Sequence, residues 1–328
     1  MEIHILARLR LHQMKRTWPN KWLEPKVRTN YEMFALRTAN GTTHQLHRRA
    51  DADPLSGAVR RSFRAAGQLR LPLLVTLMFA LTNLGAQESP SLPKVLFFAN
   101  PMSSDNDVIR RAQPNILSVA ERYFAELSKG VFDLTITQDG TQVTREKLKG
   151  YQVVVFFTAI NPAGVDTDGL IEWVRRGGAF VGIHSTANTY QNHPAFGEML
   201  GANYDRRPWR TEENPQTKVR VKVEDRTHRS TLTLGESFEI ADDIYQFKNF
   251  DHNNVQLLLS LDPTSLDLSN PKVNSEDKHF PVSWTRTHGK GRVFYTALGD
   301  WEETWKDPLY QKHLVEGILW VMEVRNGL

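Results

Sequence analysis

The sequence predicts an α/β fold, a doubly wound and mostly parallel sheet with extra β-strands in the C-terminal half. Three observations predict it. Short apolar runs alternate with amphipathic stretches between residues 94 and 184, which is the pattern of successive β-α units. One of these runs, "YQVVVFFTA" (151–159), is almost continuously apolar, as in a strand covered on both faces. Beyond about residue 200, strand-like segments dominate.

The first half of the domain contains four predicted strands, separated by helices. The strands are expected at 94–99, 132–137, 151–159 and 179–184. The helices are expected at 107–129, 144–150 and 166–178. The last of these helices has an acidic first turn and ends on two glycines, which are common helix start and stop features.

The second half is predicted to be rich in strands and to end in a helix. Strands are expected at 218–224, 238–247, 255–261, 280–287 and 291–298. The segment "HGKG" (288–291) predicts a hairpin between the last two strands. The final segment, 307–324, has the broad apolar face of a packed helix.

The charge of the chain is unevenly distributed. The formal net charge is +4, but residues 1–86 carry 14 basic and 5 acidic residues, whereas residues 87–328 carry 27 basic and 32 acidic ones. The main domain is therefore acidic overall. Because nucleic-acid binding requires a basic surface, we expect no nucleic-acid partner for it.

The N-terminal part has the features of a secretory leader. An apolar run at 71–84 follows four arginines and ends in "LGA" (84–86), so 59–86 is predicted to be a signal peptide. The alternative is a buried helix of the domain. Residues 1–58 are predicted to be a disordered, non-native extension upstream of a translation start at Val59. Cleavage near Ala86 would release a periplasmic or secreted protein without a stable membrane anchor.

The strand at 179–184 is the first candidate for a functional site. It ends at His184 and Ser185, and ligands of open α/β sheets bind beyond the carboxyl ends of the strands. We therefore expect His184 to act as an acid or base and Ser185 to contact a substrate. The alternative is a histidine that caps the next helix or fills a loop.

The segment "ADDIYQF" (241–247) offers a second group of polar side chains. If it is a strand, Asp243 and Tyr245 share one face and Asp242 faces the other way. An acid beside a phenol suits sugar hydroxyls or acid/base catalysis. The alternative is a solvated turn followed by a core tyrosine.

An ordered set of motifs resembles the ThuA-like, or trehalose utilisation, domain family. The motifs are "GGAFVGIHSTANTY" (177–190), "HPAFGEMLGANY" (193–204), "VKVEDRTHRST" (221–231), "ADDIYQF" (241–247), "LLLSLD" (257–262), "PVSWTR" (281–286) and "GKGRVFYTALGD" (289–300). The resemblance covers a domain at 92–325. It implies a flavodoxin-like, class I glutamine amidotransferase-like fold and a role in disaccharide or keto-sugar metabolism.

The resemblance also places candidate residues after the last long strand, in "ALGDWEETW" (297–305). Fold relatives carry a histidine and a glutamate there, which makes Glu302 a candidate catalytic group. Asp300, Trp301 and Trp305 are expected to bind substrate, the tryptophans by stacking on sugar faces. The alternative is a helix start with tryptophan packed inward.

His184 stands where the amidotransferases of this fold carry their nucleophilic cysteine, and the resemblance implies that ThuA-like proteins generally lack that cysteine too. The chain has no cysteine, so glutamine hydrolysis is not expected. The chain departs from the family pattern itself in "NPMSSDND" (100–107), where many relatives have a histidine, and at two further places. Arg207 lies in "RRPW" (206–209), where relatives often read "GHPW", and is expected to bind an anionic sugar group or to belong to a surface run. Asp300 replaces a histidine that many relatives have after "ALG".

Two classes of function remain open from the sequence. The first is an enzyme, a hydrolase, lyase or isomerase that acts on a small-molecule sugar. The second is a non-catalytic sugar-binding module or a structural domain of an exported assembly. The histidines lack the spacing of a zinc motif, but a divalent metal site assembled from His184, Asp243 and Glu302 is a further hypothesis.

Overall fold

The structure is a computed structural model that describes residues 91–101, 107–274, 276 and 279–323. The chain divides into two units, and the second, Leu92–Leu328, contains the described structure apart from Ser91. The predicted extension (1–58) and signal peptide (59–86) lie outside the described residues. Among the described helices, none is both long and apolar enough to cross a bilayer.

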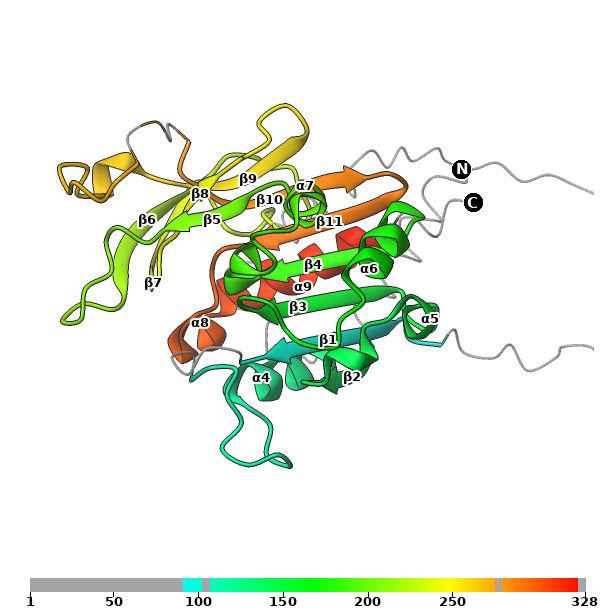
Figure 1. The fold of residues 1–328 in the computed structure, drawn as a ribbon. Helices are drawn as coiled ribbons and strands as arrows, with labels where there is room; N and C mark the ends of the chain where they lie inside the picture. The colour runs from blue at the N-terminus through cyan, green and yellow to red at the C-terminus, as the bar shows by residue number, and fades with distance from the viewer. Residues whose placement is uncertain (1–90, 102–106, 275, 277–278, 324–328) are drawn as a thin grey trace, which may run out of the picture. The chain divides into compact units, whose positions relative to one another are not determined.

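A nine-stranded sheet forms the centre of the described unit, in the order β2-β1-β3-β4-β11-β10-β9-β6-β7 (Figure 1). Its strands are β1 (Lys94–Asn100), β2 (Asp133–Thr137), β3 (Val153–Thr158), β4 (Ala179–Ile183), β6 (Thr217–Val223), β7 (Ser237–Asp242), β9 (Val255–Leu261), β10 (Pro281–His288) and β11 (Gly291–Thr296). Two short strands, β5 (Asn203–Arg206) and β8 (Gln246–Lys248), pair separately.

The sheet has a parallel half and an antiparallel half. Strands β2, β1, β3, β4 and β11 run parallel, and β10, β9, β6 and β7 extend the same sheet antiparallel to their neighbours. The predicted fold class, a mostly parallel α/β sheet with extra strands in the C-terminal half, is confirmed. The order of the parallel half is that of the flavodoxin-like folds.

Helices cover both faces of the parallel half, which explains the continuous apolar runs of its strands. The helices are α4 (Val119–Ser128), α5 (Arg145–Leu148), α6 (Thr167–Arg175), α7 (Pro194–Leu200), α8 (Glu302–Lys306) and α9 (Pro308–Met322). Figure 1 shows α9 crossing behind β3 and β4, while α6 lies in front of them. All six residues of β3 are buried, as a strand between two helical layers requires.

Two predicted elements differ from the structure. The helix expected at 107–129 begins only at Val119, because Ser118 and Glu121 form a capping box there and Pro114 lies upstream. The strand expected at 238–247 is interrupted, since β7 ends at Asp242 and β8 begins at Gln246. Residues 243–245 therefore form a connection, and Asp243 and Tyr245 do not share a strand face.

Candidate active site

His184 is held in a fixed orientation directly after β4. It begins a short 3₁₀ turn (His184–Asn188) and has φ +42°, an uncommon backbone conformation for a residue other than glycine. Its side chain is 1% exposed. The ring Nδ1 donates a hydrogen bond to the carbonyl of Ala297 (2.7 Å), and the His184 carbonyl accepts one from the Tyr295 hydroxyl (2.7 Å). The other ring nitrogen, Nε2, consequently faces Asp300 at 3.3 Å.

Asp242 joins the loop after β7 to the loop after β11. Its buried carboxylate accepts hydrogen bonds from the backbone N–H groups of Gly299 (2.8 Å) and Asp300 (3.1 Å) and from the Thr304 hydroxyl (2.9 Å). It also accepts one from the N–H of Asp243 (2.8 Å). One carboxylate thus fixes the main chain of Asp243 and Asp300 together.

Burial raises the pKa of Asp242 to about 6, because a charged carboxylate loses its water. The nearby His184 and the N–H of Gly299 act in the opposite direction and lower that pKa. At neutral pH Asp242 is therefore mainly ionised and can accept from all four donors.

Asp243 is fully buried and is paired with two arginines. Its Oδ2 accepts a hydrogen bond from Nη1 of Arg207 and another from Nη1 of Arg210, both at 2.9 Å. Arg210 also reaches Oδ2 of Asp300 at 3.4 Å. Arg210 therefore bridges the two carboxylates, whereas Arg207 pairs with Asp243 alone. Oδ1 of Asp243 has no hydrogen-bond partner among the described residues.

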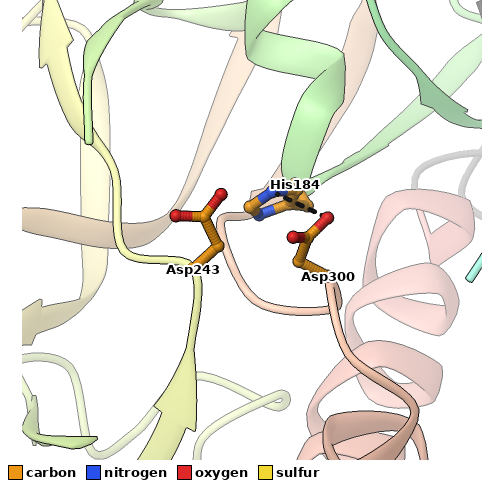
Figure 2. A group of neighbouring side chains, drawn as sticks. All are labelled: His184, Asp243 and Asp300. Carbon is orange, nitrogen blue, oxygen red and sulfur yellow. Dashed lines mark ion pairs between the residues drawn. The ribbon is translucent and has the colours of Figure 1, made fainter. Parts of the chain in front are cut away.

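His184, Asp243 and Asp300 form one cluster (Figure 2). One ring nitrogen and one oxygen from each carboxylate all lie within 4.8 Å of one another. The figure shows the two aspartates on either side of the imidazole, each from a different loop. The three residues follow β4, β7 and β11, which are far apart in sequence, so the fold alone brings them together.

Tyr245 packs against this cluster. Its ring centroid lies 4.2 Å from that of His184 and 4.6 Å from that of Tyr204. Burial raises the pKa of Tyr245 well above its ordinary value, and the negative charge of Asp243 raises it further. Tyr245 thus stays protonated near neutral pH and is suited to donate a hydrogen bond, not to act as a base.

The structure does not bring two of the sequence-predicted residues into the cluster. Glu302 begins α8 and pairs with Lys306 at 3.3 Å, with its side chain 40% exposed. Its expected place beside His184 and Asp243 is taken by Asp300. Trp305 is fully buried, stacks with Phe157 and donates its indole N–H to the Gly299 carbonyl, so it has no face available to a sugar.

Ser185 and Trp301 remain beside the site. Ser185 is 5% exposed, and its hydroxyl has no hydrogen-bond partner among the described residues. Trp301 is half-buried, and its indole N–H is likewise without a partner within the described structure. Both atoms are themselves buried, so a ligand could reach them only if neighbouring side chains moved.

Trp305 and Trp301 are expected to differ in their effect on stability. Trp305→Phe removes a buried hydrogen bond and leaves a cavity, so we expect the free energy of unfolding to fall by about 2 kcal/mol. Trp301→Phe, at a half-buried position, should cost less than about 1 kcal/mol. Urea unfolding of both variants measures the difference. Equal costs would contradict the assignment of Trp305 to the core.

A cavity of about 640 Å³ adjoins the cluster. It is lined by Arg207, Arg210, Thr211, Glu212, Pro215 and Lys272. Its lining does not include His184, Asp243 or Asp300, so the two arginines stand between the cavity and the buried cluster. Of the three cluster side chains Asp300 is the most exposed, at 12%. A ligand in the cavity meets guanidinium groups first.

Asp242 has no predicted role in the sequence. Its expected position on the strand face opposite Asp243 is the one sequence signal that points to it. An aspartate that ends a strand and faces inward must find several donors, and the backbone of the Gly299–Asp300 turn supplies them. Gly299 has φ +123°, and a Cβ there would lie 2.6 Å from the Tyr310 hydroxyl, so the turn requires glycine.

Comparisons with known proteins agree with this fold. The chain matches the family "ThuA: Trehalose utilisation" over residues 94–321. The solved structure of a ThuA-like protein from Bacteroides uniformis is 27% identical, with a TM-score of 0.59, and the match covers 72% of this chain and 94% of that one. A ThuA-like protein from Parabacteroides merdae is 16% identical, with a TM-score of 0.52 and coverages of 71% and 90%, and supports the fold alone. No match was found among curated proteins. Through residues 94–321, the chain belongs to the ThuA family.

Proposed function

We propose that this protein is exported and takes part in carbohydrate metabolism. It acts on a disaccharide or keto sugar at the carboxyl ends of β4 and β11. The family description, trehalose utilisation, supports the substrate class. The observation that carries the proposal is the convergence of one imidazole, two carboxylates and two guanidinium groups at this edge of the sheet.

The burial of these groups supports chemistry over simple packing. His184 and Asp243 are each at most 1% exposed, and burying ionisable groups costs free energy unless they are paired. Clusters of this kind are characteristic of functional sites. The uncommon backbone conformation of His184 points the same way, since such strain gathers at functional positions.

Each group has a role that its surroundings suit. The bond from Nδ1 to the Ala297 carbonyl leaves Nε2 of His184 to exchange a proton with the sugar, beside Asp300. Arg207 and Arg210 bind sugar oxygens or a carboxylate from the cavity side. An imidazole at the tip of β4 cannot form a thioester, so the proposed reaction is a hydrolysis, elimination or isomerisation and not an amide transfer from glutamine.

A non-catalytic sugar-binding module is the second candidate, with a structural domain of an exported assembly as its variant. It is favoured by the position of Arg207 and Arg210, which already pair with Asp243 and separate the cavity from His184. It is also favoured by the absence of Trp305 and Glu302 from the cluster.

A direct test measures binding and turnover with the full chain. Trehalose, other disaccharides and their keto derivatives are incubated with the protein, and products are followed by NMR. Turnover that disappears in His184→Asn supports the enzyme. Saturable binding that Arg207→Ala weakens, without any product, supports the binding module. If no compound of the panel is bound or turned over, the proposed substrate class is contradicted.

Export is tested separately. The apolar run at 71–84, preceded by arginines, supports cleavage near Ala86. N-terminal sequencing of the protein recovered from outside the cytoplasm should begin near Gln87. A mature form that retains residues 1–58 would contradict both the signal peptide and the translation start at Val59.

A further inference from the structure

We infer that His184, Asp243 and Asp300 form a binding site for one divalent transition-metal ion. The inference goes beyond the proposed sugar chemistry, because it concerns what the three side chains bind before any substrate arrives. Imidazole nitrogen and carboxylate oxygen together are typical ligands of Zn²⁺ and Mn²⁺ in proteins.

The first argument is the orientation of the His184 ring. Nδ1 is committed as a donor to the Ala297 carbonyl, since a carbonyl can only accept. In a neutral ring, Nε2 then presents a lone pair, and it lies 3.3 Å from a carboxylate oxygen of Asp300. Two acceptors face each other, so a proton or a metal ion must lie between them. Metal-bound histidines generally have this arrangement, with the second ring nitrogen donating to a backbone carbonyl or a carboxylate.

The second argument is the unsatisfied oxygen of Asp243. The side chain is fully buried, its Oδ2 accepts from both arginines, and its Oδ1 has no donor in the described structure. An unpaired buried carboxylate oxygen is costly. A cation beside it removes that cost.

The spacing of the three groups suits one ion. A ligand set at about 2.1 Å from a tetrahedral ion places its atoms about 3.4 Å apart. The separation of 3.3 Å between Nε2 of His184 and Oδ1 of Asp300 matches this value. All three ligand atoms lie within 4.8 Å of one another. Three protein ligands leave at least one coordination position open, which is characteristic of catalytic rather than structural sites.

Neighbouring residues hold the ligands in place. Asp242 accepts from the backbone N–H groups of both Asp243 and Asp300, and Arg207 and Arg210 fix the Asp243 carboxylate. The two arginines offset two of the three carboxylates, Asp242, Asp243 and Asp300, so a bound divalent ion still leaves the site positive. We therefore expect the open position to attract an anionic or oxygen-rich group. With the ion bound, Nε2 of His184 is a ligand and no longer the proton-exchanging group.

The test is a metal titration of the full chain after removal of metals with EDTA and dialysis. Calorimetry with Zn²⁺ alone and with Mn²⁺ alone should show one saturable site. Asp243→Asn and Asp300→Asn should each weaken binding by about 100-fold or more. The matched control is Asp168→Asn, which removes the charge of the exposed partner of the half-buried His193 (3.1 Å) and should leave affinity unchanged.

A second readout separates coordination from surface binding. Co²⁺ added to the metal-free protein should give visible absorption bands that change in His184→Asn. Circular dichroism in EDTA checks that each variant is folded. If Asp243→Asn does not fold, Asp300→Asn still tests the site, because Asp300 is the most exposed of the three ligands. Binding that is absent, or equally strong in the wild type and both ligand variants, would overturn the inference. Sugar turnover in EDTA would leave the proposed function standing without the metal.

Discussion

Replacing Asp242 by alanine is expected to lower the free energy of unfolding by about 3 kcal/mol at pH 7, since up to four buried donors lose their acceptor. Those donors are three backbone N–H groups and the Thr304 hydroxyl. Thr304→Val removes one of these bonds and should cost only about 1 kcal/mol. Urea unfolding measures both. Equal costs for the two variants would contradict the role of Asp242 as the connection between the two loops.

The cost of Asp242→Ala should also depend on pH. The pKa of this carboxyl is about 6 in the folded protein, above its ordinary value of 3.8. The folded state thus binds a proton more readily, and the stability that Asp242 contributes falls as the pH rises through 6. The difference between wild type and variant should therefore be about 1 kcal/mol larger at pH 5 than at pH 7. A difference that shrinks on acidification would contradict the raised pKa.

Replacing His184 by asparagine in the metal-free protein is expected to lower the turnover of the sugar substrate by about 10²–10⁴-fold, the usual contribution of a positioned acid or base. Asparagine tolerates the positive φ of this position, so the backbone should keep its conformation. Melting temperature checks the fold. His193→Asn provides the matched control, because His193 lies outside the cluster. Wild-type turnover in His184→Asn would remove His184 from the chemistry.

The sequence predicted the layered core well because hydrophobic periodicity reports burial. The strand at 255–261 has the predicted bounds, and β3 lies within the predicted 151–159. Interruptions were harder to predict. The apolar pattern of 238–247 continues through residues 243–245, although these leave the sheet. Asp242 binds the N–H of Asp243 at the start of this connection, and its other three partners lie more than fifty residues away in the chain.

The candidate site was predicted only in part, because the apolar pattern locates the end of a strand but not the turn of the loop that follows it. His184 follows a buried strand, and sequence alone identified it as lying at the sheet edge. Which acidic residue joins it depends on how the loop after β11 turns. Asp300 faces His184, whereas Glu302, two residues later, is on the exposed side of α8. Both tryptophans were expected to contact a sugar, but Trp305 points inward because α8 packs its buried face there. No spacing rule distinguishes these cases without the three-dimensional turn.

The central claim is that His184, Asp243 and Asp300 are one chemical unit. Nitrogen-15 NMR of the histidine rings tests it without a substrate, with the His184 resonances assigned through His184→Asn. The account predicts a protonated Nδ1 and an Nε2 resonance that shifts in both Asp243→Asn and Asp300→Asn, while Asp168→Asn shifts only His193. His184 resonances that shift in neither Asp243→Asn nor Asp300→Asn would contradict this claim.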